Sequence, residues 1–400
     1  MRGKAFLALE NHSKACYWFK ESLKVDSLCV ESFENLIEHN MITAKEGKEI
    51  INNITVQDNM EWLKEIYFCK LKDYNNNNDD DKEGKEISVL NRIDKLENKY
   101  KIKNNSEVII IKADYYYYKQ KYQEAVDIIK NIIENEPHNS KILTTYISCL
   151  VQLKNKQQLF YISHKLIEEN NGMAVSWYGV GCYYYLIGNY DTSRRYFSKS
   201  TTIDSNFGAA WIGFGHSFAA QGEHDQAMAS YRSASRMLSS SHLPHLFIAM
   251  ELIRVNNFNL AEKYIEQSKS ICSDDPLIYN ELGVIAYKNK QYQNAVILFK
   301  KSIDLVSIEN LNEIWEPTLS NLAHSYRKLK LYNEAIKYYL QALTVTPNNS
   351  SIYGSLGFTY QLQCNFLLAI EYYHKCLSLK PDDSFIVDCL NQSLLLINYL

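Results

Sequence analysis

The sequence repeats with a period of 34 residues, and this period limits the possible folds more than any other feature of the chain. Adding 34 to Trp177 and Gly181 gives Trp211 and Gly215, residues of the same kinds. Eight units follow one another, with one step of 40 among steps of 34, and their first residues are Ser106, Ser140, Ala174, Gly208, His242, Pro276, Glu316 and Ser350. Such a chain grows by stacking similar units, each of which contacts mainly its neighbours.

The residues at equivalent positions indicate two helices that cross closely in each unit. Position 8 is Gly or Ala in seven of the eight units, and position 20 is Ala in six. A close crossing needs small residues, while aromatic residues at positions 4, 11 and 24 fill the space around it. Pro137, Pro347 and Pro381 at position 32 end the second helix. This is the tetratricopeptide repeat (TPR) pattern. We therefore predict an all-α superhelical solenoid of helix-turn-helix pairs, helix A followed by helix B.

Two units depart from the pattern. The unit at Ser140 has Ile147 and Leu159 at the two small positions, which predicts a distorted helix pair. Six extra residues lie between Ile308 and Trp315. We expect them either to form a longer loop or to extend helix B.

The regular array occupies only part of the chain. We expect three segments: an N-terminal TPR remnant with following helices at 1–71, an Asn- and Asp-rich loop at 72–86, and a continuous TPR array at 87–398 with a capping helix from Ser384. The loop has almost no apolar residues and is expected to be disordered. Positions 1 to 4 of the first unit would precede Met1. The chain is thus expected to begin inside a repeat, as a fragment or because the true start lies upstream.

Composition excludes several classes of partner and compartment. The 43 basic and 46 acidic side chains are scattered, which gives no electrostatic footprint for nucleic acid or for a membrane surface. No signal peptide is visible, and the longest uncharged run, 174–190, is too short and polar to span a membrane. Nine Cys without a C-x-x-C pair fit neither a disulfide framework nor a zinc site. Reduced thiols in the nucleus and cytoplasm are expected.

The segment "GHSFAAQGEHDQAM", residues 215–228, resembles a reactive cluster because His and carboxylates bind metals and transfer protons. His216 is at position 9 of helix A, and His224 lies eight residues later, beyond the turn. The two imidazoles are therefore not expected to meet on one ion, and Asp225 suits the first turn of helix B. The stretch 179–184 has only two glycines of a dinucleotide fingerprint. We predict no catalytic, metal or cofactor site.

A TPR array does offer a partner-binding face. Positions 2, 5, 9 and 12 of helix A fall on one side of the helix and line the concave groove of such a solenoid. We call the following predicted groove residues the A-face residues: Val175, Tyr178, Cys182, Tyr185, Ile212, His216, Leu246, Met250, Ile253, Leu277, Asn280, Tyr287, His324, Arg327 and Phe358. Their apolar and aromatic character favours an elongated partner that inserts hydrophobic side chains. The alternative is that a tight superhelix buries them against neighbouring A helices.

Several long stretches resemble one particular family. These include "VSWYGVGCYYYLIGNYDTSRRYFSKSTTIDSNFGAAWIGFGHSFAAQGEHDQAMASY" and "WEPTLSNLAHSYRKLKLYNEAIKYYLQAL". They are similar to the cell-division-cycle sixteen family, the sixth, TPR-containing subunit of the anaphase-promoting complex (cyclosome). Generic TPR positions do not demand "GHSFA" followed by "EHDQAM", nor an insertion that ends in "WEP". The resemblance implies a non-catalytic scaffold in a ubiquitin ligase that acts in mitotic cell-cycle progression.

The resemblance also implies partners. These are other anaphase-promoting complex subunits, among them the small cell-division-cycle twenty-six type subunit, whose N-terminal segment lies in the groove. Family members self-associate through N-terminal repeats, but these would largely precede Met1, so a homodimer is doubtful for this chain. The alternative function is a TPR adaptor or co-chaperone that grips an acidic peptide. Such a clamp needs Lys, Asn and Arg at groove positions, where this sequence mainly has Tyr, Ile, Leu and Met. No stretch is left for a catalytic domain.

Overall fold

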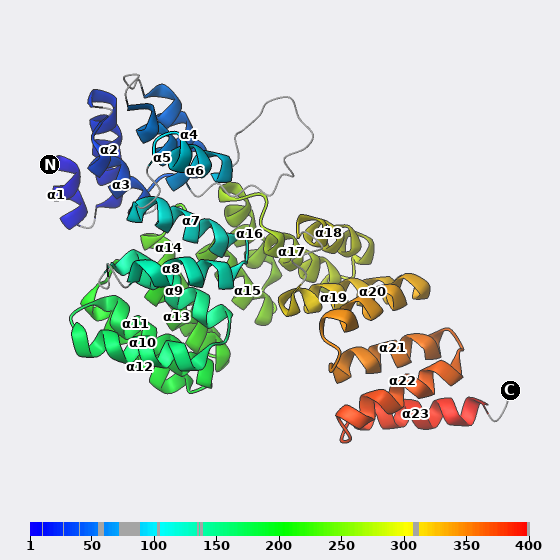
Figure 1. Cartoon of the computed structure of the whole chain (residues 1–400). Helices are drawn as coiled ribbons and strands as arrows, with labels where there is room; N and C mark the ends of the chain where they lie inside the picture. The colour runs from blue at the N-terminus through cyan, green and yellow to red at the C-terminus, as the bar shows by residue number, and fades with distance from the viewer. Residues whose placement is uncertain are drawn as a thin grey trace. The chain divides into compact units, whose positions relative to one another are not determined.

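The computed structural model confirms the all-α TPR architecture. It describes residues 1–9, 11–26, 28–39, 41–54, 60–71, 89–101, 105–133, 136, 139–306 and 312–397, and in these ranges every regular element is helical. The chain divides into two units, Met1–Ile271 and Cys272–Leu400, which are described separately. Figure 1 labels the α-helices of both. Within the described ranges, no helix is both long enough and apolar enough to cross a membrane.

The first unit contains the following helices: α1 (Arg2–Ala8), α2 (His12–Val25), α3 (Val30–Glu38), α4 (Ala44–Asn53), α5 (Glu61–Lys70), α6 (Val89–Asn98), α7 (Ser106–Tyr118), α8 (Tyr122–Ile133), α9 (Ser140–Gln152), α10 (Lys156–Glu169), α11 (Ala174–Ile187), α12 (Tyr190–Ile203), α13 (Gly208–Ala220), α14 (His224–Met237), α15 (Leu243–Arg254) and α16 (Phe258–Ile271). The second unit contains α17 (Pro276–Lys288), α18 (Tyr292–Leu305), the 3-10 helix η3 (Glu313–Trp315), α19 (Glu316–Lys328), α20 (Tyr332–Val345), α21 (Ser350–Leu362), α22 (Phe366–Leu379) and α23 (Ser384–Ile397).

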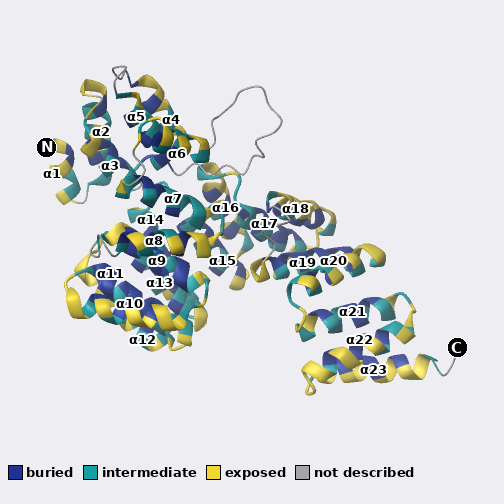
Figure 2. Ribbon diagram, viewed as in Figure 1, coloured by how far each residue is buried: buried dark blue, intermediate teal, exposed yellow. Residues whose placement is uncertain are grey.

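From α7 onward, the odd-numbered helices are A helices and the even-numbered ones are B helices. Each A helix begins at the residue that the 34-residue period assigns to position 1, except α15, which begins one residue later at Leu243. Short polar side chains fix several of these starts. Asn105, Asn139 and Asn349, together with Asp275, accept a hydrogen bond from a backbone N–H of the first turn. Many helices carry both buried and exposed residues, as the colours of Figure 2 show, whereas α11 is buried at 174–176 and 178–182.

The small residue at position 8 allows helix A to approach the aromatic ring at position 24. A Cβ atom added to Gly283 would lie 2.7 Å from Cε1 of Phe299, closer than carbon atoms pack. The unit at Ser140 has no such small residue, because Ile147 and Leu159 are both fully buried there. As the sequence predicts, its helices α9 and α10 contact each other less than those of any other A–B pair.

In four repeats, an aromatic residue at position 4 ties helix A to the turn before it. Trp177 Nε1 donates a hydrogen bond to the carbonyl oxygen of Asn171 at 2.8 Å, and the Tyr279 hydroxyl donates to the carbonyl oxygen of Ser273 at 2.8 Å. The acceptor lies six residues earlier in both cases. The ring thus supplies apolar area while its polar tip satisfies a backbone group.

The turn from helix A to helix B has the same backbone geometry in all eight repeats. Position 15 adopts a left-handed conformation, with φ between 53° and 89°, at Gln120, Lys154, Gly188, Gly222, Asn256, Lys290, Lys330 and Cys364. Only two of these residues are glycines, which accept positive φ without strain. The chain therefore reverses direction at a fixed position, whatever residue stands there.

The insertion before α19 does not lengthen helix B. Helix α18 ends at Leu305 after 14 residues, the same length as α20 and α22. The short helix η3 precedes α19, and Trp315 at its end is buried, with 3% of its surface exposed. The extended-helix alternative is therefore wrong. Residues 307–311, the predicted disordered loop at 72–86 and Pro137 lie outside the described residues.

Candidate functional site

All A-face residues lie on A helices, as their spacing requires. In the first unit they belong to α11, α13 and α15, and in the second unit to α17, α19 and α21. The half-buried ones are Tyr185, Ile212, His216, Met250, Leu277, Asn280, Tyr287, His324, Arg327 and Phe358. The buried ones are Val175, Tyr178, Cys182, Leu246 and Ile253. The two groups have different roles.

The five buried A-face residues lie in the hydrophobic core of the described structure. Tyr178 packs edge-on against Phe207, with ring centroids 5.3 Å apart, and also contacts Phe197. Val175 and Cys182 belong to the same hydrophobic cluster. Residues of neighbouring helices cover these side chains, so the burial alternative holds for them. A partner surface can include only the half-buried A-face residues.

His216 has an internal hydrogen-bond partner. Its Nδ1 lies 2.8 Å from the hydroxyl oxygen of Tyr231, and its ring meets that of Phe247 with centroids 4.7 Å apart. Burial, assisted by the positive charge of Arg254, lowers the pKa of His216 to about 4. The imidazole is therefore neutral at pH 7. Its ring fills space and satisfies a buried hydroxyl group.

The second unit contains the same arrangement. His324 hydrogen bonds through Nδ1 to the hydroxyl of Tyr339, again between positions 9 and 24 of one repeat. Burial lowers the pKa of His324 to about 4, helped by the nearby cations Arg327 and Lys328. The arrangement therefore recurs in two separate repeats.

The pairing of residues at positions 9 and 24 is a functional detail that sequence reasoning missed. Where position 24 is Phe197 or Phe299, which have no hydroxyl, position 9 is Cys182 or Val284. Histidine at position 9 therefore accompanies a tyrosine at position 24 in two repeats and is absent from these two. In a third repeat, Tyr373 at position 24 is accompanied by Phe358 at position 9 and donates its hydrogen bond to Oε1 of Gln361 at 2.5 Å instead. The sequence signal is therefore a co-occurrence in two of three repeats with a tyrosine at position 24.

The remaining members of the histidine- and acid-rich segment also serve packing. His224 Nδ1 lies 2.6 Å from Oε2 of Glu251, and Arg254 Nη1 lies 2.8 Å from Oε1 of the same carboxylate. Glu251 is 3% exposed, so its charge is stabilised by these two partners. Glu223 pairs with Arg194 at 2.9 Å. Among the described residues, no three His, Cys, Asp or Glu side chains are placed to hold a metal ion.

Arg327 on α19 is in a different situation from Arg254. Its guanidinium lies 5.2 Å from the ring centroid of Phe358 on α21. Phe358 in turn contacts Phe385 on α23, with ring centroids 6.0 Å apart. Within the described part of the chain, Arg327 forms no ion pair. Arg254, by contrast, forms an ion pair with Glu251.

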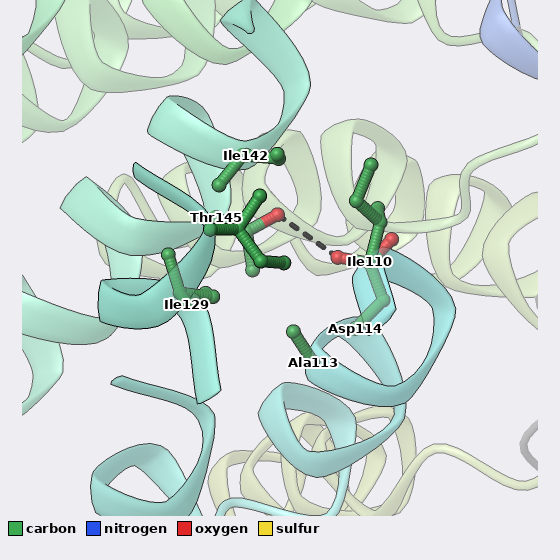
Figure 3. Close-up of a pocket in the computed structure, with 7 residues that line it drawn as sticks. Ile110, Ala113, Asp114, Ile129, Ile142 and Thr145 are labelled. Atoms are coloured by element: carbon green, nitrogen blue, oxygen red, sulfur yellow. Dashed lines mark hydrogen bonds between the residues drawn. The ribbon is translucent and has the colours of Figure 1, made fainter. Parts of the chain in front are cut away.

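A small pocket lies among α7, α8 and α9 (Figure 3). Its lining is apolar, including Ile110, Ala113 and Ile129, apart from one polar pair. The Thr145 hydroxyl donates a hydrogen bond to Oδ1 of Asp114 at 2.9 Å. Because this pair is satisfied internally, the lining offers a ligand little besides apolar contact.

Comparison with protein families supports the repeat assignment. Family models described as tetratricopeptide repeat match residues 317–349, and also 174–207, 277–305 and 350–383. The chain is 42% identical to anaphase-promoting complex subunit 6 of Arabidopsis thaliana, across 99% of this chain and 73% of that protein. It is 37% identical to the cell division cycle protein 16 homolog of Mus musculus, across 98% of this chain and 63% of that protein. The chain thus spans less than two thirds of the mouse relative.

A solved structure has the same fold. It is described as the crystal structure of the APC/C hetero-tetramer Cut9-Hcn1 and matches with a TM-score of 0.83 at 32% identity. The match covers 98% of this chain and 74% of that one.

Proposed function

Because the chain belongs to the family of anaphase-promoting complex subunit 6, we propose that it is a TPR scaffold subunit of that ubiquitin ligase and acts in mitotic cell-cycle progression. The observation that carries the proposal is the 42% identity to the plant subunit over 99% of the chain. A similarity of that length involves loops and helix surfaces as well as the small and aromatic positions that all TPR proteins share.

The proposed role is structural and not catalytic. The residues that most resemble a reactive group are occupied in packing: His216 holds the Tyr231 hydroxyl, and His224 holds the Glu251 carboxylate. A general acid or base must instead reach a substrate and have a pKa near the working pH. The pKa of His216 is lowered to about 4, far from that range.

We further propose that the half-buried A-face residues bind a small accessory subunit of the cell-division-cycle twenty-six type. Two observations support this. The related structure is described as a complex of Cut9 with Hcn1. Within the first unit, Ile212 and Met250 leave apolar surface on α13 and α15 that neighbouring helices do not completely cover, and within the second unit Tyr287 does so on α17. Covering such surface with a partner's apolar side chains is favourable, at about 25 cal/mol per Å².

The first prediction concerns this binding. The full chain carrying Ile212→Glu or Tyr287→Glu should bind its accessory subunit about 10- to 100-fold more weakly, because a charge replaces an apolar contact. Isothermal titration calorimetry of the purified proteins measures the change. Ile297→Glu is the matched control, because Ile297 lies on B helix α18 and is 64% exposed. If all three variants bound as tightly as the wild-type protein, with unchanged circular dichroism, the A-face residues would not form the binding surface.

A further inference from the structure

Arg327 is the only A-face residue with a permanent charge, and no carboxylate among the described residues pairs with it. Its guanidinium stacks near Phe358 and forms no ion pair among the described residues. A guanidinium has five N–H donors and stays charged at every physiological pH. A half-buried guanidinium without a carboxylate leaves strong hydrogen-bonding capacity unused.

The described groups whose pKa values Arg327 shifts are the hydroxyls of Tyr287, Tyr339 and Tyr373 and the imidazole of His324. Burial raises the pKa of Tyr287 and of Tyr339, and the charge of Arg327 opposes both increases. Arg327 and Lys328 also help burial to lower the pKa of His324. The guanidinium therefore influences hydroxyl and imidazole groups from α17, α19, α20 and α22. An acidic group that approached this place would meet positive potential.

Apolar rings continue from Arg327 along the later A helices. The guanidinium meets Phe358 at 5.2 Å, and Phe358 meets Phe385 at a centroid distance of 6.0 Å. Phe385 is 59% exposed, which is high for an aromatic side chain with a neighbouring aromatic partner. We call Arg327, Phe358 and Phe385 the Arg327 strip. It joins one unpaired cation to two rings across α19, α21 and α23.

We propose that the Arg327 strip binds a segment of the accessory subunit in which an Asp or Glu side chain is accompanied by an apolar side chain. The carboxylate would pair with the guanidinium fork, which matches its geometry, and the apolar side chain would cover Phe385. This inference rests on the proposed function, because it names the chemistry of the partner at the same A-face.

The geometry also sets a spacing in the partner. The Arg327 guanidinium lies 5.2 Å from the ring centroid of Phe358, and the centroid of Phe385 lies 6.0 Å further on. An extended chain advances about 3.3 Å per residue. The acidic and apolar side chains should then be separated by about two positions if the apolar one covers Phe358, and by up to about four if it covers Phe385.

The test compares two charge-neutralising variants of the same repeat in the full chain. Arg327→Gln should weaken binding of the accessory subunit about tenfold, the loss expected for a hydrogen bond to a charged group. Lys337→Gln removes the same charge from an exposed position on B helix α20 and should leave the affinity unchanged. Arg327→Lys keeps the charge but loses the planar fork, so an intermediate affinity is expected. Calorimetry at low and high salt measures all three variants.

A charge exchange identifies the partner residue. Arg327→Glu should abolish most of the binding, and replacing one acidic residue of the accessory subunit by Lys should restore it. Equal affinities for Arg327→Gln and Lys337→Gln, with Ile212→Glu still defective, would overturn the Arg327 strip and leave the proposed function intact. Failure of the wild-type chain to bind the accessory subunit would overturn both.

Discussion

At position 9 of two repeats, a histidine completes the hydrogen bonding of a buried tyrosine. His216 and His324 each meet the hydroxyl at position 24, and burial keeps both imidazoles neutral. A buried hydroxyl without a partner costs roughly 1–3 kcal/mol, so the pair stabilises its repeat. At the residue scale, the same side chain therefore looks like a metal ligand in the sequence and is a packing element in the structure.

This pairing predicts a loss of stability in mild acid. The unfolded chain binds a proton on His216 near pH 6.5, whereas the folded chain resists protonation until about pH 4. The contribution of His216 to the free energy of unfolding is complete above pH 6.5. It decreases as the pH falls toward 4, by about 2 kcal/mol between pH 7 and pH 5. Urea unfolding at the two pH values measures it. His216→Gln should reduce the pH dependence, and an undiminished dependence would show that His216 titrates normally.

At the scale of elements, the A–B turn is the most uniform part of each repeat. Position 15 is left-handed in all eight repeats, although Lys occupies it at Lys154, Lys290 and Lys330. A residue with a Cβ atom is strained in this conformation by roughly 1–2 kcal/mol. Packing of the two helices therefore imposes the turn against local preference, and Gly188 and Gly222 are the two places where sequence and turn agree.

Substitutions at this position should have opposite effects in two repeats. Gly188 has φ 89° and no atom within 4 Å of an added Cβ, so Gly188→Ala tests strain without any clash. It should destabilise the protein by about 1 kcal/mol. Lys330→Gly should stabilise by up to about 1 kcal/mol, because the strain is relieved at some cost in unfolded-state entropy. Thermal denaturation measures the change in melting temperature of each variant relative to the wild-type protein. If both melting temperatures rose or both fell, strain at position 15 would not explain the stability of the turn.

At the scale of the whole molecule, the TPR repeats continue across the boundary between two compact units of the chain. Units Met1–Ile271 and Cys272–Leu400 are each internally compact, although the repeat pattern shows no break between them. Among its described residues, the second unit holds a hydrophobic cluster around Phe299 and Tyr339 and another around Tyr373. In a repeat array, stability is a sum of such local terms.

The second unit is therefore expected to fold without the first. A fragment of residues 272–400 should show a helical circular dichroism spectrum and a cooperative thermal transition, because its core residues come from its own helices. A fragment carrying Phe299→Ala should be less stable by about 3–5 kcal/mol, since Phe299 is fully buried. A disordered wild-type fragment would show that the clusters need contacts from the rest of the chain.

The sequence by itself determined the helix pairs, because their information is local and repeated. The starts of α11, α17 and α21 follow from the 34-residue period, and the small residue at position 8 predicts the close crossing. The family resemblance likewise depends on contiguous stretches. Each of these features is encoded within one or two units, so no knowledge of distant contacts is needed.

Only the tertiary structure decided which A-face residues are available to a partner. Tyr178 and Tyr287 both occupy this face, yet neighbouring helices bury the first and leave the second half-exposed. Arg254 and Arg327 both lie in the last turn of an A helix, yet among the described residues only Arg254 has a carboxylate to pair with. Exposure and charge pairing depend on side chains of other helices, which a periodic pattern does not specify.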